Sequence, residues 1–118
     1  MDAESRQRIQ KCYTSLLDLD CTPADLLGSL VEKQVLDFDD QERILAEITS
    51  KDKAEKFISI LITKENSYKP FREVLKKAHE FIGERLDAVE IDYDLIKKGK
   101  QIKRAIYFYY LFLSIQLS

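Results

Sequence analysis

Glycine and proline are scarce in this chain of 118 residues, which contains only three glycines and two prolines. Sandwiches and barrels of β-strands need a turn about every 8–12 residues, and this chain cannot supply those turns. Gly28, Gly83 and Gly99 are also too far apart to build a phosphate-binding loop. Apolar residues make up 45% of the chain and charged residues 34%, which is typical of one folded domain of this length. The sequence therefore predicts an all-α domain.

Apolar residues recur at the spacing of a helix face in six successive segments. The expected starts are marked by residues that cap helices, namely Asp2, Thr22, Asp37, Thr49 or Ser50, and Ser67. We expect the sixth helix to begin at Glu84, after a break at Gly83. In the third helix, Ile44, Leu45 and Ile48 are expected to face inward. Links of about 2–5 residues should pack neighbouring helices into one bundle.

Residues suited to catalysis or metal binding are few. The single histidine, His79, lies between lysines and a glutamate, so we interpret it as a solvated helix residue rather than a general base. The acidic pairs at positions 39–40 and 92/94 lack the loop pattern of a calcium site. We therefore expect no enzymatic activity, no metal and no cofactor.

The two cysteines, Cys12 and Cys21, are too few for a disulfide framework or, with one histidine, for a zinc site. Residues 1–4 are polar and acidic, unlike a secretory or transit peptide. The net charge of −2 argues against binding to nucleic acid. Together these features predict reduced thiols and a cytoplasmic protein.

The charges are distributed unevenly along the chain. Residues 20–47 hold eight acids and two bases, whereas residues 48–64 hold four lysines and two acids. The first helix places Arg6, Arg8 and Lys11 close together. Two interpretations stay open at this point. The faces are ordinary solvated helix surfaces, with acids favoured at helix N-termini, or they are complementary surfaces on which similar domains stack.

Several segments carry recognisable patterns in a fixed order. Residues 26–36 form a leucine-rich helix and its exit, residues 37–48 an acidic helix, and residues 51–57 the start of a basic helix. In this order and spacing they resemble a caspase recruitment domain (CARD) of the death-fold superfamily. Residues 65–71 and the opening residues 1–3 are similar to the CARDs that head protease-activating factors of apoptosis.

The resemblance covers residues 2–92 and implies a six-helix antiparallel Greek-key bundle. It implies a non-enzymatic domain that binds another CARD-containing protein, as an adaptor or regulator of caspase activation, apoptosis or innate immune signalling, and self-association is a further option. Carried over by position, the acidic partner-binding face comprises Asp25, Glu32, Asp39, Asp40 and Glu42, and the basic face comprises Arg8, Lys11, Lys53 and Lys56. Lysine cannot make the planar paired contact of arginine, so we expect the basic face to bind more weakly. We also expect charge reversal at Asp39 and Asp40 to abolish binding without unfolding the domain.

Residues 93–118 form a separate tail, which is first basic and then, from residue 105 to 113, continuously apolar. A helix from residue 105 to 118 would be about 21 Å long, whereas a membrane core is about 30 Å thick, so spanning is not favoured. The tail could instead lie in a membrane interface, pack on the bundle, contact a partner, or be an ill-ordered extension. A peripheral membrane protein, and a structural helical domain without a CARD partner, are the alternative hypotheses.

Overall fold

The computed structural model of the chain describes residues 1–19 and 26–98. Within these ranges every regular element is a helix, which confirms the predicted all-α class for the described residues. The helices are α1 (Ala3–Lys11), α2 (Tyr13–Leu17), α3 (Gly28–Glu32), α4 (Phe38–Leu45), α5 (Ser50–Leu61), α6 (Tyr68–Ala78) and α7 (Glu80–Ala88). A short helical stretch follows at residues 93–98.

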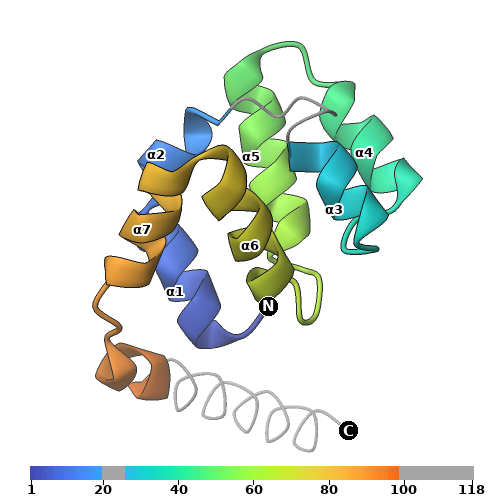
Figure 1. Ribbon diagram of the computed structural model, residues 1–118. Helices are drawn as coiled ribbons and strands as arrows, with labels where there is room; N and C mark the ends of the chain where they lie inside the picture. The colour runs from blue at the N-terminus through green and yellow to red at the C-terminus, as the bar shows by residue number, and fades with distance from the viewer. Residues whose placement is uncertain (20–25, 99–118) are drawn as a thin grey trace, which may run out of the picture.

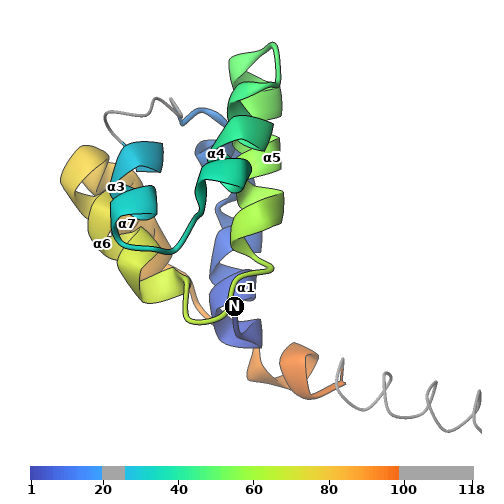
Figure 2. The ribbon, with the colours of Figure 1, turned by 90° about the vertical axis from the view of Figure 1, so that its right-hand side faces the viewer.

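The helices pack in pairs that join distant parts of the chain. Helix α7 contacts both α6 and α1, α5 contacts both α4 and α2, and α3 contacts α6. Figure 1 shows α1 and α7 on one side of the molecule and α3 and α4 on the other. In the view turned by 90°, α3, α6 and α7 lie on the left and α5 lies on the right (Figure 2). Because α1 contacts α7, it is in position to contact the segment that follows α7.

One hydrophobic core joins these helices. Phe57 of α5 and Phe71 of α6 are fully buried at its centre, where their ring centroids are 5.8 Å apart and the rings are tilted by 57°. Leu16 of α2, Leu30 of α3 and Leu86 of α7 are also fully buried. Burying such a side chain contributes about 1.5–3 kcal/mol relative to leaving it in water. The core therefore holds elements from both ends of the chain in one unit.

Three of the predicted helix starts are confirmed by side-chain caps. The Asp2 carboxylate accepts a hydrogen bond from the Ser5 backbone N–H at 2.8 Å, and Thr49 Oγ1 accepts one from Asp52 N–H at 3.0 Å. Asp37 caps α4 in the same manner. Ser67 precedes α6 but its side chain makes no capping bond. The expected cap at Thr22 lies outside the described residues.

The first and third helices end sooner than predicted. Cys12 departs from helical geometry, with φ −107° and ψ 15°, and divides the expected first helix into α1 and α2. Its free thiol is buried, and this burial raises the pKa of the thiol. Helix α4 ends at Leu45, so Ile48 lies beyond the helix and is 93% exposed rather than inward-facing. Leu45 is also exposed, whereas Ile44 is buried as expected.

The last predicted helix begins earlier than expected. Helix α7 starts at Glu80, not Glu84, and Gly83 lies buried within it rather than breaking it. A Cβ atom at position 83 would lie 3.2 Å from the Cα of Lys76, so glycine allows α7 to approach the α6 backbone closely. The break falls instead at half-buried His79, whose backbone departs from helical geometry between α6 and α7.

After α7, residues 89–92 form no regular element, with Val89 extended, and lead into the stretch at residues 93–98. The Asp92 carboxylate caps this stretch by accepting a hydrogen bond from Leu95 N–H at 3.0 Å. The rest of the predicted tail, and with it every expectation about the apolar run, lies outside the described residues. None of the described helices is long and apolar enough to cross a membrane.

Candidate interaction surfaces

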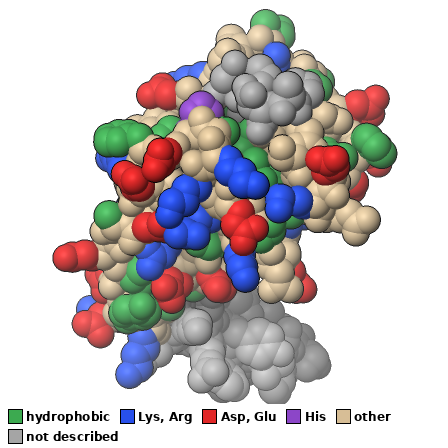
Figure 3. Space-filling view, in the orientation of Figure 1, with side chains coloured by type: hydrophobic (Ala, Val, Ile, Leu, Met, Phe, Trp, Pro, Cys, Tyr) green, Lys and Arg blue, Asp and Glu red, His purple; other side chains and the backbone are tan. Residues whose placement is uncertain are grey.

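Three of the predicted acidic residues lie exposed on α3 and α4. Glu32 ends α3, and Asp39 and Glu42 lie on α4. Within residues 1–19 and 26–98, no ion pair involves any of the three. In Figure 3, acidic side chains appear at the right-hand edge, where Figure 1 places α3 and α4. These carboxylates are free to meet cations of another molecule. Asp25, the fifth predicted residue, lies outside the described part of the chain.

Asp40 is placed differently from the other acidic positions. Its side chain is 1% exposed and accepts from Arg43 Nη2 at 2.6 Å and Lys64 Nζ at 2.8 Å. It also forms a capping box with Asp37, in which each carboxylate accepts a hydrogen bond from the other residue's backbone N–H. Asp40 therefore ties the start of α4 to the segment after α5.

These contacts control the ionisation of Asp40. Burial by itself would raise its pKa, but hydrogen bonds from Lys64, the Asp37 backbone and Arg43 lower the pKa to about 2. The buried carboxylate is thus charged at neutral pH. A positive charge at this position would face Arg43 and Lys64 inside the protein. The burial of Asp40 argues against the expectation that its reversal leaves the fold intact, because the reversal would place a cation in a buried position beside Arg43 and Lys64.

The predicted basic residues of α1 are engaged within the molecule. Arg8 Nη1 donates to the backbone oxygens of Leu86, Asp87 and Val89 at 2.8, 3.2 and 3.4 Å. Its Nη2 pairs with Glu4 at 3.4 Å, and only 20% of the Arg8 side chain is exposed. The guanidinium thus acts as a cation at the C-terminus of α7, where the helix dipole favours positive charge.

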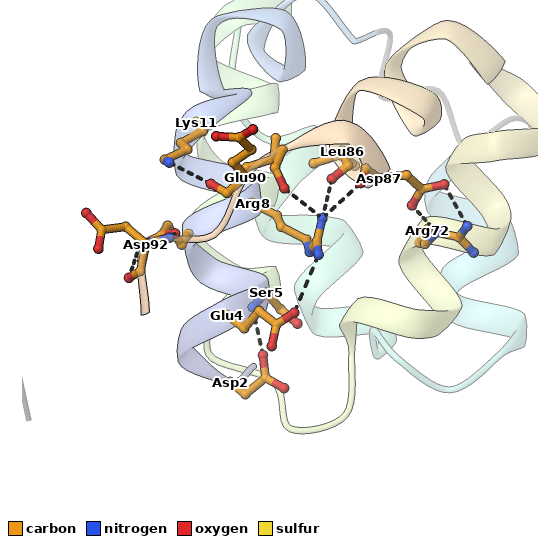
Figure 4. A network of polar contacts seen from close by, with 12 residues as sticks. Asp2, Glu4, Ser5, Arg8, Lys11, Arg72, Leu86, Asp87, Glu90 and Asp92 are labelled. Atoms are coloured by element: carbon orange, nitrogen blue, oxygen red, sulfur yellow. Dashed lines mark hydrogen bonds and ion pairs between the residues drawn. The ribbon is translucent and has the colours of Figure 1, made fainter. Parts of the chain in front are cut away.

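Lys11, one turn further along α1, contacts the segment that follows α7. Its Nζ donates to the backbone oxygen of Glu90 at 2.7 Å, while the residue as a whole stays exposed. Figure 4 shows Lys11 and Arg8 both pointing from α1 toward the end of α7 and the chain beyond it. The α1 half of the predicted basic face is therefore occupied in this structure.

The predicted basic residues of α5 are available but are not isolated from acids. Lys53 and Lys56 make no ion pair with any residue that the structure describes. Lys56 lines a shallow hollow of about 350 Å³ together with Tyr13 of α2 and the acids Glu47, Asp52 and Glu55. This half of the basic face is thus a mixed surface, and a partner carboxylate there would meet repulsion as well as attraction.

The two predicted faces do not neutralise each other. Among the described residues, no ion pair joins a member of the acidic set to a member of the basic set. Asp40 pairs with Arg43 and Lys64, and Arg8 pairs with Glu4. The exposed acidic residues therefore keep their charge for an external partner.

Sequence reasoning missed a basic groove between α3 and α6. A hollow of about 680 Å³ is lined by the cations Lys33, Arg72, Lys76 and Lys77 and by the acids Glu32 and Glu73, and Lys33 pairs with Glu73 at 3.7 Å. Figure 3 shows lysine and arginine side chains gathered in the middle of this view, over α6. Most of this charge is balanced, because Arg72 pairs with Asp87 at 2.5 and 2.7 Å and Lys76 lies 3.8 Å from the same carboxylate.

The spacing of Arg72 and Lys76, one helical turn apart on α6, is the signal that could have revealed this groove. The balancing acid could not be found in the same way, because Asp87 lies on α7. The Arg72 guanidinium beside it holds the pKa of the Asp87 carboxyl below its ordinary value.

The described residues form a bundle of short helices with exposed charge on its faces, which suits a domain that binds other proteins. The family model for the caspase recruitment domain matches residues 6–87. The chain therefore belongs to the CARD family, whose members are non-catalytic domains that bind other CARD-containing proteins in apoptotic and immune signalling. The comparison with curated proteins and the comparison with solved structures gave no significant match.

Proposed function

We propose that this chain is an adaptor or regulator of caspase activation or innate immune signalling that uses its acidic α3–α4 surface to bind the basic surface of another CARD. The contact residues on this surface are Glu32, Asp39 and Glu42, with Asp25 added from the sequence pattern. The observation that carries the proposal is that the three described carboxylates are exposed and form no ion pair with a described residue. They lie on a domain of the CARD family, whose members bind other CARDs.

The basic surface contributes less to this proposal. Lys53 and Lys56 are unpaired among the described residues, yet Lys56 lies beside three acids. Lysine also lacks the paired geometry of arginine toward a carboxylate. We therefore expect the chain to act mainly through its acidic side, with self-association through both sides weaker than binding to a CARD that presents arginines.

Charge reversal on the full chain tests the proposal. The variant Glu32→Lys/Asp39→Lys/Glu42→Lys is compared with wild type in pull-downs against a panel of purified CARDs at low and at physiological salt. Wild type should bind at least one CARD, more weakly as salt rises, because the contact is between exposed charges. The triple variant should lose binding by about tenfold or more, since attraction is replaced by like-charge repulsion.

A matched control carries three charge reversals at exposed acids away from α3 and α4, Glu80→Lys/Glu84→Lys/Asp94→Lys. This control should bind as wild type does, and both variants should keep the helical circular dichroism signal. The proposal fails if the acidic-face variant binds as tightly as the control, or if no CARD binds wild type at low salt.

Three finer features belong to the same proposal. The similarity of residues 65–71 and 1–3 to the N-terminal CARD of apoptotic protease-activating factor supports a place among caspase-activating pathways. The functional domain is proposed to span residues 2–92. A cytoplasmic location is proposed from the low number of cysteines, two in 118 residues.

A further inference from the structure

Three side chains of α1, those of Gln7, Arg8 and Lys11, form hydrogen bonds with the segment that follows α7. These bonds are not part of the backbone hydrogen bonding of either helix. Gln7 is 6% exposed, and its side-chain amide bonds both the backbone N–H and the backbone C=O of Asp92. Asp92 N–H donates to Gln7 Oε1 at 2.6 Å, and Gln7 Nε2 donates to the Asp92 backbone oxygen at 3.3 Å. This paired contact fixes the end of the segment 89–92 against α1.

The same segment uses donors of the predicted basic face. Its Glu90 oxygen accepts from Lys11 Nζ and its Val89 oxygen accepts from Arg8 Nη1. Figure 4 shows these contacts as one network that runs along α1 from Glu4 to Lys11. A hydrogen bond from a charged group is stronger than a neutral one, so these oxygens compete with any external carboxylate for the same donors.

We infer that residues 89–92 form a strap that engages the donors of the α1 half of the basic face, and that an acidic partner must displace the Glu90 oxygen to pair with Lys11 Nζ. The inference rests on the proposed function for the identity of the partner, an acidic CARD surface. The strap itself is inferred only from the contacts of Gln7, Arg8 and Lys11 with residues 89–92. Because the binding-competent state is then a fraction of the population, the strap lowers the apparent affinity by that fraction.

The substitution Gln7→Ala loosens the strap without changing any charge. It removes both bonds to Asp92 and places a strong helix former in α1. Gln10→Ala is the matched control, since Gln10 is exposed on the same helix and makes no side-chain bond with any described residue. Both variants are made in the full chain and checked for an unchanged helical signal.

The first readout is the acylation rate of Lys11 by a small amine-reactive ester, measured by mass spectrometry with Lys53 as internal reference. Gln7→Ala should raise the Lys11 rate several-fold relative to Lys53, because the ammonium is no longer held at Glu90. Gln10→Ala should leave it unchanged. An unchanged Lys11 rate in Gln7→Ala overturns the strap, whatever the partner binds.

The second readout is affinity between two copies arranged so that only one contact can form. The receptor is labelled and carries the neutralising changes Glu32→Gln/Asp39→Asn/Glu42→Gln, with or without Gln7→Ala. The added probe is the chain carrying Lys53→Gln/Lys56→Gln, which keeps its acidic face. Fluorescence anisotropy should show about 3–10-fold tighter binding to the Gln7→Ala receptor.

The outcomes separate this inference from the proposed function. If Lys11 is acylated faster in Gln7→Ala but the probe binds neither receptor, the strap is confirmed. The same result counts against the proposed binding through the acidic and basic faces. Binding of equal affinity to both receptors overturns the masking role. Amide hydrogen exchange at Asp92 adds a test without any change at Gln7, since adding the probe to the receptor with native Gln7 should speed exchange there, and unchanged protection in the bound state refutes displacement.

Discussion

Replacing Asp40 by asparagine removes the buried charge that links α4 to the segment after α5. The asparagine oxygen can still accept from the Asp37 N–H, and the backbone N–H of residue 40 still donates to Asp37, so the capping box keeps both of its bonds. The two cations that Asp40 holds, Arg43 and Lys64, are 58% and 33% exposed and can turn to water. The change therefore isolates the contribution of the ionised carboxylate.

The size of the effect follows from the pKa of Asp40. A value of about 2 in the folded protein against 3.8 in the unfolded chain corresponds to about 2 kcal/mol of stability at neutral pH. Because the folded pKa is the lower one, this stability is fully present above about pH 4 and is lost as the pH falls toward 2. Wild type should thus exceed Asp40→Asn by about 2 kcal/mol at pH 7, and the difference should shrink toward pH 2.

Urea unfolding followed by circular dichroism, at pH 7 and at several values down to pH 2.5, measures the difference. Asp39→Asn is the matched control, because this exposed neighbour makes no ion pair with the described residues, and it should change stability by at most about 0.5 kcal/mol. Equal stability of wild type and Asp40→Asn at pH 7, or a difference that does not vary with pH, would refute the reasoning.

Two further predictions concern the packing of α6 against α7. Gly83→Ala should destabilise the fold by about 1 kcal/mol in urea unfolding, because the clash of the new Cβ with Lys76 exceeds the gain in helix propensity; a more stable variant would show that the helices can separate freely. Arg72 and Asp87, each about one-third exposed, should show a coupling energy below about 1 kcal/mol in a double-mutant cycle, and a larger value would mean that solvent screens this pair less than its exposure indicates.

Much of the local structure was predictable because its causes lie within a few residues. The caps at Asp2, Asp37 and Thr49 each bond a backbone N–H three residues ahead, so a capping residue before an apolar pattern was enough to locate the start. The helix ends were harder. Cys12 and Ile48 fit the apolar period, yet the chain turns at both places.

The residues of the acidic surface could be predicted from sequence only where their position on a helix face determines whether the side chain is exposed. Asp39 and Asp40 are neighbours of the same type, and the sequence pattern assigns them the same role. Only the fold distinguishes them, because Asp40 pairs with Lys64, which follows α5 and is 24 residues away in the sequence. Similarly, Gly83 reads as a helix breaker until α6 is placed against it.

The sequence by itself determined the helical class, the order of the segments and the uneven distribution of charge, since these depend on composition and on neighbours within one or two turns. The tertiary structure decided which charges remain available. Arg8 and Lys11 meet the end of α7 and the residues after it, some 80 positions away in the chain. Such contacts depend on how the helices pack, and no local pattern encodes which backbone oxygen a long cationic side chain will find.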